Sequence, residues 1–149
     1  MTNKDEYFMS LALKEAKKAY DIDEVPVGCV IVLNDKVIAR AYNKREKDKS
    51  SISHAEILAI KKASKKLDSW RLDDCKIYVT LEPCIMCAGA ILQAKIKNLY
   101  YGAKELRYGS ISLANIFSYK YNYDISVLGG ILEEESSMLI SSFFKKLRN

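Results

Sequence analysis

Apolar residues recur every three or four positions near both ends of the chain, with charged residues between them. This spacing predicts amphipathic helices over residues 3–20 and from residue 131 to about 147. Asn3 is placed to cap the first helix, whose acidic first turn and lysine-bearing last turn match the helix dipole. Gly129 and Gly130 end the preceding apolar run before the last helix begins.

The middle of the chain alternates short runs of β-branched and aromatic residues with two further helical patterns. Asn34 and Asp35 separate the first two runs and predict a hairpin turn. The predicted strands are residues 25–33, 36–42, 76–81, 98–102 and 125–128, and the predicted inner helices cover residues 53–67 and a segment from 84 through 92. This order predicts one sheet with helices on both faces, whose chemistry collects at strand carboxyl ends.

The composition predicts one folded soluble domain over residues 1–149, since 49% of the residues are apolar and 29% are charged. No apolar run approaches the roughly 20 residues of a membrane helix, and the polar start predicts no secretory signal. Four cysteines, two of them in the metal motif described next, indicate a reducing cytoplasm. The net charge of +5 permits an anionic partner such as a nucleic acid without requiring one.

Two short motifs predict a metal site. One is His54-Ala55-Glu56, which contains the single histidine, and the other is Pro83-Cys84-Ile85-Met86-Cys87. Cysteines three positions apart at a helix start can bind one metal ion, and the helix N-terminus favours their thiolate form. One histidine and two cysteines leave a fourth position open, which is typical of catalytic zinc. Glu56 is near enough to take a proton from a water molecule activated there.

The combination H-x-E with P-C-x-x-C is the signature of zinc-dependent base deaminases. Each part also has another interpretation. Ser53 and Glu56 fit a helix capping box, and Cys-x-x-Cys alone fits a redox pair or half of a structural zinc site. A structural fourth ligand would be Cys29, Cys75 or a carboxylate, but neither cysteine has motif spacing, and both fit buried apolar positions. Together the motifs favour catalytic zinc.

A wider set of residues carries a family resemblance. It includes Glu-Val-Pro-Val-Gly at 24–28, Val-Thr-Leu-Glu-Pro-Cys-Ile-Met-Cys-Ala-Gly-Ala at 79–90 and the Phe-Phe-Lys-Lys-Leu-Arg ending, with shorter matches at residues 42–43, 54–56, 101–103 and 130–132. The chain resembles the bacterial tRNA-specific adenosine deaminases of the cytidine deaminase-like superfamily. This resemblance implies a three-layer α/β/α fold with a mixed five-stranded sheet.

The resemblance also implies an activity. The expected reaction is hydrolytic deamination of the wobble adenosine of a tRNA anticodon loop to inosine, by zinc-activated hydroxide with a glutamate proton shuttle. The expected enzyme is a cytoplasmic homodimer with one Zn²⁺ per subunit bound by His54, Cys84 and Cys87, and with Glu56 as the catalytic residue. Part of the RNA is expected to lie against the neighbouring subunit.

Substrate contacts are implied by the same match. Asn43 is expected to bond the flipped purine, and Glu105 lies in a loop that reads the nucleotide. The complete implied set is Val27, Asn43, Ala55, Leu81, Pro83, Glu105, Phe144, Lys145 and Arg148, in which Val27 and Leu81 wall the pocket and the last three approach the RNA from the last helix.

The chain departs from the family at three places. Glu105 replaces the usual aspartate, the stretch after Gly109 is shortened and lacks a glycine before Ser112, and Tyr123 stands where histidine is common. Tyr119 and Tyr121 alternate with Tyr123, which fits either stacking on bases or one face of an extended segment. The alternation favours the extended segment.

Phe143 continues an apolar helix stripe, which favours a place in the core, whereas Phe144 lies off that stripe. Two other functions remain possible from the sequence. One is a zinc deaminase of a free base or nucleoside, of the guanine or cytosine type. The other is a zinc-stabilised RNA-binding module without enzymatic activity, which would need a fourth protein ligand on the metal.

Overall fold

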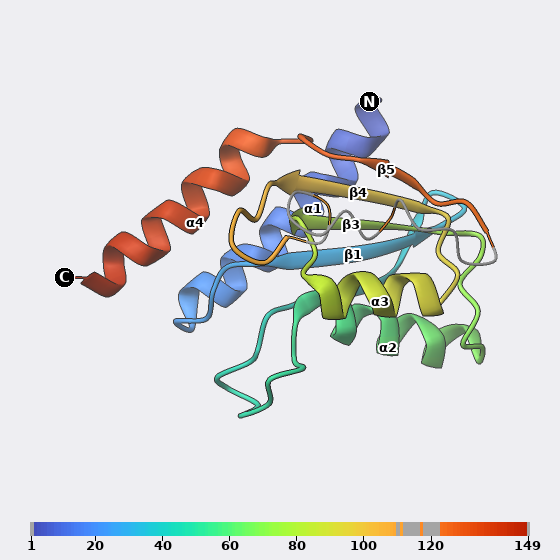
Figure 1. The fold of residues 1–149 in the computed structure, drawn as a ribbon, viewed down its shortest axis with the longest axis horizontal. Coiled ribbons are helices and arrows are strands. Elements are labelled where there is room, and N and C mark those ends of the chain that lie inside the picture. Colours follow the sequence, from blue (N-terminus) through green and yellow to red (C-terminus); the bar gives the residue numbers. More distant parts are fainter. Residues whose placement is uncertain (1, 110, 112–116, 118–122, 149) are drawn as a thin grey trace.

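The computed structural model describes residues 2–109, 111, 117 and 123–148. Within them lie α1 (Asn3–Asp21), β1 (Gly28–Leu33), β2 (Lys36–Tyr42), α2 (Ala55–Leu67), β3 (Cys75–Leu81), α3 (Ile85–Gln93), β4 (Asn98–Ala103), β5 (Ser126–Leu128) and α4 (Glu133–Arg148) (Figure 1). Ser112, Tyr119 and Tyr121 lie outside the described residues, so the expectations about them stay predictions. No helix among the described residues is long and apolar enough to cross a membrane.

The five strands form one mixed sheet, as expected, and their order in it is β2-β1-β3-β4-β5. β1 is antiparallel to β2 and β3, whereas β3, β4 and β5 run parallel. Asn34 and Asp35 form the predicted hairpin turn with φ of 50° and 61°. Positive φ at both central residues is what a two-residue hairpin of type I′ requires, and Asn and Asp tolerate it.

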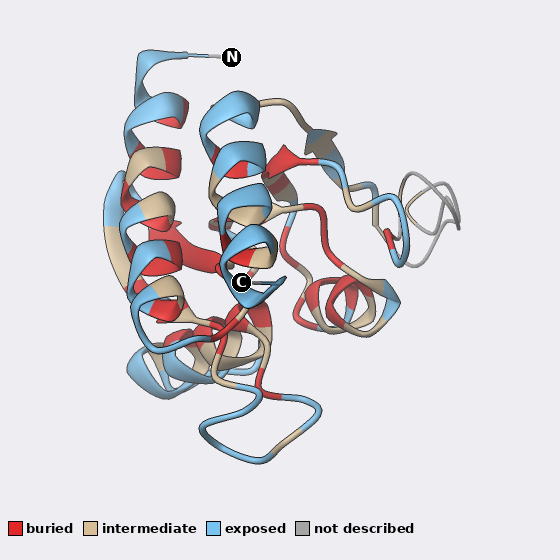
Figure 2. Ribbon diagram, turned by 90° about the vertical axis from the view of Figure 1, so that its left-hand side faces the viewer, coloured by how far each residue is buried: buried red, intermediate tan, exposed pale blue. Residues whose placement is uncertain are grey.

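Helices cover both faces of the sheet, which confirms the three-layer α/β/α fold. Val30 and Val32 belong to the apolar core beneath α1, whereas Ile31 and its neighbour Cys29 belong to the core beneath α2 and α3. Because both faces of β1 are covered, all four side chains are buried. Figure 2 shows buried residues on the inward sides of the helices and exposed residues on their outer sides.

The first helix begins at Asn3 as predicted but has a different capping residue, and the first strand begins later than predicted. Thr2, not Asn3, caps α1: its Oγ1 accepts from the Asp5 N–H, and the Asp5 carboxylate accepts from the Thr2 N–H. β1 begins at Gly28 instead of residue 25. A Cβ at position 28 would lie 2.0 Å from the Ala12 carbonyl oxygen, so glycine lets β1 pack directly against α1.

The starts of α2 and α4 are also corrected. His54 is the N-cap of α2 and makes no side-chain cap bond, so the Ser53–Glu56 capping box does not form. The Ser53 hydroxyl instead donates to Asp48. α4 begins two residues later than predicted because Leu132 has a left-handed φ of 52°, which a right-handed helix cannot include.

Candidate active site

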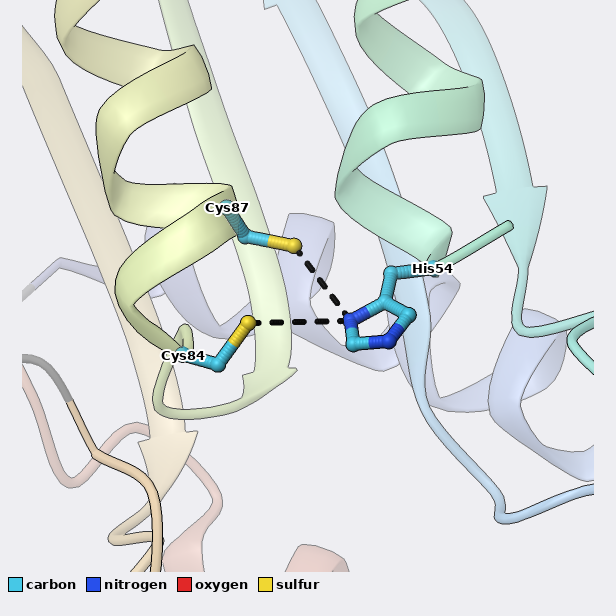
Figure 3. A group of neighbouring side chains, drawn as sticks. All are labelled: His54, Cys84 and Cys87. Carbon is cyan, nitrogen blue, oxygen red and sulfur yellow. Dashed lines mark hydrogen bonds between the residues drawn. The ribbon is translucent and has the colours of Figure 1, made fainter. Parts of the chain in front are cut away.

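The candidate metal ligands meet where β3 ends and two helices begin. His54 is the N-cap of α2, Cys84 is the N-cap of α3, and Cys87 lies in the first turn of α3. The side chains of these three residues point toward one another from the two neighbouring helix starts (Figure 3). The chain therefore brings together residues that are 30 and 33 positions apart in sequence.

The donor atoms have the spacing of a tetrahedral zinc site. His54 Nδ1 lies 3.7 Å from Cys84 Sγ and 3.5 Å from Cys87 Sγ. With Zn–S and Zn–N bonds of about 2.3 and 2.0 Å, donors on one tetrahedral ion lie about 3.6 Å apart. These residues therefore fit zinc. Among the described residues, this group of mutually close His, Cys and carboxylate donors has three members, and neither Cys29 nor Cys75 belongs to it.

The two site cysteines differ in acidity because the thiol of Cys87 donates a hydrogen bond to the sulfur of Cys84. A hydrogen bond from Cys87 lowers the pKa of the Cys84 thiol to about 4. The same bond, with burial, raises the pKa of Cys87 well above its ordinary value. Metal binding requires both thiolates and releases the remaining proton. Cys29 and Cys75 are buried and unpaired, in agreement with their predicted place in the core.

Glu56 is a buried carboxyl group in the first turn of α2, two residues after His54. Burial, which penalises the charged form, raises its pKa to about 7. A carboxyl group with a pKa near neutrality can both accept and donate a proton during one reaction.

A cavity of about 450 Å³ opens over this group, within the range of small-molecule sites. Nine of the predicted site residues line it, namely Val27, Asn43, His54, Ala55, Glu56, Leu81, Cys84, Glu105 and Phe144. Cys87 and Pro83 do not line the cavity. Lys145 and Arg148 are exposed on α4 and also lie outside its lining.

Asn43 is held in one orientation at the cavity wall. Its Nδ2 donates to the Val25 carbonyl at 3.1 Å, and its Oδ1 accepts from the Arg45 N–H at 3.1 Å. An amide group has two N–H donors and an oxygen with two lone pairs. Among the contacts of the described residues, one donor and one acceptor site of Asn43 therefore remain available for a ligand.

Glu105 is bound within its own loop. Its Oε1 accepts from the Arg107 N–H at 2.8 Å and lies 3.6 Å from Arg107 Nε. Phe143 is 2% exposed, which confirms its place in the core, yet it also contributes to the cavity wall. The Tyr123 hydroxyl donates to the carbonyl of Ile96 at 3.0 Å, so this group is bound to the protein.

The sequence interpretation assigned no site role to several residues of the cavity wall. These are the rim residues Arg45, Glu46 and Tyr108, and the buried carboxylates Glu24 and Glu82. A signal was present for Glu82, which is an isolated acidic residue directly after an apolar run of strand character, whereas Glu24 follows Asp21 and Asp23 in an acidic stretch. Buried acidic residues need compensating partners, and this requirement points to a defined role.

The geometry of the site agrees with comparisons to known proteins. The profile of the family described as "Cytidine and deoxycytidylate deaminase zinc-binding region" matches residues 2–103. The tRNA-specific adenosine deaminase of Bacillus subtilis (strain 168) is 46% identical over 146 residues, which cover 97% of this chain and 91% of that protein. The chain belongs to the family of tRNA-specific adenosine deaminases.

Solved structures agree with the assignment of this chain to the tRNA-specific adenosine deaminases. One, from a study of A-to-I editing by tRNA:A34 deaminases, has a TM-score of 0.85 and 43% identity, and the match covers 89% of this chain and 98% of that chain. A guanine deaminase from Bacillus subtilis has a TM-score of 0.65 and 32% identity, with coverage of 83% and 72%. Both fold and sequence are therefore more similar to the tRNA deaminase than to this guanine deaminase.

Proposed function

We propose that residues 1–149 act as one deaminase domain that converts the wobble adenosine of a tRNA anticodon loop to inosine by hydrolysis. One observation carries this proposal. The buried carboxyl group of Glu56 lies at a cavity beside three zinc-type donors, in a chain 46% identical to a tRNA-specific adenosine deaminase.

His54, Cys84 and Cys87 hold one zinc ion per subunit in this proposal. When bound, zinc supplies a Lewis acid that makes a water molecule easy to deprotonate near neutral pH. Glu56 accepts one proton from the attacking water and donates it to the ring nitrogen. It then accepts the proton of the hydroxyl group formed on carbon 6 and donates it to the amine that leaves. Adenosine and water thereby give inosine and ammonia.

The base reaches Glu56 after leaving its stack. Base flipping costs least where the base is already unpaired, as in an anticodon loop. Asn43 offers its remaining donor and acceptor to the purine, Val27 and Leu81 wall the pocket, and Ala55 borders the base. Pro83 is buried outside the cavity lining, so its contact with the base stays a prediction from the resemblance. Glu105 lies beside the nucleotide in its cavity-lining loop.

Residues of α4 hold the rest of the anticodon loop. Phe144 offers a ring for stacking, and the exposed Lys145 and Arg148 contact phosphates. A free-base deaminase would not need these outer contacts.

The protein acts as a homodimer in the cytoplasm in this proposal. Ile52 and Ile85, close in sequence to the zinc ligands, are 53% and 56% exposed, and Leu106 is 70% exposed. Exposed apolar side chains near a site favour a partner surface there. Four unpaired cysteines agree with a reducing compartment. Light scattering on the purified protein tests the dimer.

The activity is tested by incubating the zinc-loaded protein with total tRNA, and separately with guanine, cytosine and mononucleosides. Inosine at the wobble position supports the proposal. Turnover of free bases or nucleosides without tRNA editing would select the free-base deaminase. RNA binding without any turnover, with a fourth protein ligand on the metal, would select the binding module.

A further inference from the structure

Two buried carboxylates line the cavity and accept hydrogen bonds from main-chain N–H groups. Glu24 is 1% exposed and lies between α1 and β1, whereas Glu82 is 2% exposed and directly follows β3. Each binds the backbone of a different loop, and both loops contribute side chains to the cavity wall.

Glu24 holds the loop that connects β2 to α2. Its Oε1 accepts from the Glu46 N–H at 3.0 Å, and its Oε2 accepts from the Lys47 N–H at 2.7 Å. The side chains of Glu46 and its neighbour Arg45 line the cavity. The loop is closed at its base by the Lys44 N–H, which donates to the Ser53 carbonyl. Glu24 therefore fixes the tip of a loop whose ends are already joined.

Glu82 holds the loop that follows β4. Its Oε1 accepts from the Glu105 N–H at 3.1 Å, and its Oε2 accepts from the Ile111 N–H at 2.8 Å. Between these two residues, Arg107 and Tyr108 line the cavity. The carboxylate thus joins two main-chain positions on either side of Arg107 and Tyr108.

Gly109 provides a second, independent sign that this loop is held closely. A Cβ at this position would lie 2.3 Å from Glu82 Oε2 and 2.3 Å from the Glu105 carbonyl oxygen. Gly109 also forms an isolated β-bridge with the zinc-site residue Cys84. The absence of a side chain at 109 therefore lets the loop reach the carboxylate and the start of α3 together.

We propose that Glu24 and Glu82 are positioning residues that hold these two loops at the mouth of the pocket for the RNA around the target base. Both loops lie at the same end of the sheet (Figure 1). Each carboxylate uses both oxygens as acceptors, and a glutamine would present an N–H₂ donor to one of the two N–H groups. The RNA part of this inference rests on the proposed function, whereas the anchoring does not.

Glu24→Gln and Glu82→Gln test the proposal, with Asp5→Asn as a matched control. Asp5 is a buried carboxylate that also accepts two hydrogen bonds but does not line the cavity. In Glu82→Gln, the Glu105 and Ile111 amides should exchange about 10- to 100-fold faster by NMR, since hydrogen bonds to charged groups are strong. In Glu24→Gln, the same increase in exchange rate should appear at the Glu46 and Lys47 amides instead.

Steady-state kinetics distinguish a positioning role of Glu24 and Glu82 from a direct role in the chemical step. With zinc content unchanged, each variant should raise KM for tRNA about tenfold, the scale of one such hydrogen bond, and should leave kcat nearly unchanged. Asp5→Asn should lower stability and leave both the loop amides and KM at wild-type values. Unchanged exchange in the affected loop, or a loss of kcat at constant KM, would overturn the proposal.

A third variant and the exchange rates of the wild-type protein also test the anchoring of the two loops. Gly109→Ala should reproduce the Glu82→Gln effects, because it displaces the same carboxylate. If the glutamine variants do not fold, the four amides in the wild-type protein should still be protected, and exchange at the rate of open coil would refute anchoring. A wild-type protein that does not edit tRNA would refute the proposed function, while the exchange data would still decide the anchoring.

Discussion

The guanidinium group of Arg107 lies over the ring of Phe144, 5.5 Å from its centroid. This contact joins the loop after β4 to α4 at the cavity wall, which both residues line. Lys146 fixes the same part of α4 to the end of α1, through Asp23 at 3.0 Å and the Tyr20 carbonyl at 3.1 Å. The last helix is therefore docked beside the pocket by side chains that a terminal deletion would remove together.

Phe144→Ala should weaken tRNA binding with the zinc site and fold retained. Stacking of a base on an aromatic side chain contributes about 1–3 kcal/mol, so the dissociation constant should rise about 5- to 150-fold. Fluorescence anisotropy with a labelled anticodon stem-loop measures it. Met138→Ala, at a 61% exposed position of the same helix, is the control and should bind normally. Equal binding by both variants would place recognition elsewhere.

Cys84→Ser should reduce zinc content from about one ion per chain to a small fraction, because the site has three protein donors. Metal analysis measures the loss, and X-ray absorption on the wild type should show one nitrogen and two sulfur ligands. Cys75→Ala, which removes a buried thiol outside the group, should keep its zinc. Three or four sulfur ligands in the wild type would contradict an open catalytic site.

Tyr78→Phe should destabilise the fold in a pH-dependent way. The Tyr78 hydroxyl donates to Asp5 at 2.7 Å. Burial acts to raise the pKa of Asp5, but hydrogen bonds from Tyr78 and Thr2 outweigh it and hold the pKa below its ordinary value of 3.8. A carboxyl group with a lowered pKa stabilises the fold above its ordinary value, and this stabilisation is lost as pH falls through the lowered value.

Urea denaturation should therefore show Tyr78→Phe to be about 1.5–3 kcal/mol less stable than the wild type at pH 7. The difference should shrink at pH 3. Release of zinc in acid affects both proteins alike, so the difference between them is the quantity to compare. Tyr100→Phe, which alters the ring stacked on Tyr78, is the control. A difference independent of pH would mean that the Asp5 charge is not involved.

tRNA binding should weaken steeply with salt, because each neutralised phosphate releases counterions. Lys145→Ala and Arg148→Ala should each reduce the slope of log affinity against log salt by about 0.7–0.9. Lys14→Ala, an exposed position on α1, should leave the slope unchanged. Titrations at several salt concentrations measure these slopes, and a flat salt dependence in the wild type would count against phosphate contacts.

Much of the fold could be predicted because its elements have strong local signals. The β2 bounds and the Asn34–Asp35 turn agree with prediction, since alternation and turn chemistry act over a few residues. The start of α4 was wrong because Leu132 takes a left-handed conformation while the Ile131 N–H donates to the Tyr101 carbonyl of β4. That contact depends on the packed sheet, so helical periodicity did not reveal it.

In the candidate site, too, residues with a local sequence motif could be predicted, and residues that act through tertiary contacts could not. Motif spacing predicted which residues would converge on the metal, and the structure brings together His54, Cys84 and Cys87. The roles of Glu24 and Glu82 were missed, because their partners are main-chain N–H groups up to 29 residues away. Any residue type supplies such a group, so the sequence carries no mark of the pairing.

The catalytic role of Glu56 has a direct kinetic test. Single-turnover formation of inosine in tRNA should be compared for zinc-loaded wild type and Glu56→Gln, with zinc content, tRNA affinity and thermal stability measured on the same samples. If Glu56 is the proton shuttle, Glu56→Gln should keep its zinc content and tRNA affinity and react about 100- to 10,000-fold more slowly, the usual contribution of a positioned proton shuttle. A Glu56→Gln protein that edits tRNA at the wild-type rate would contradict this role.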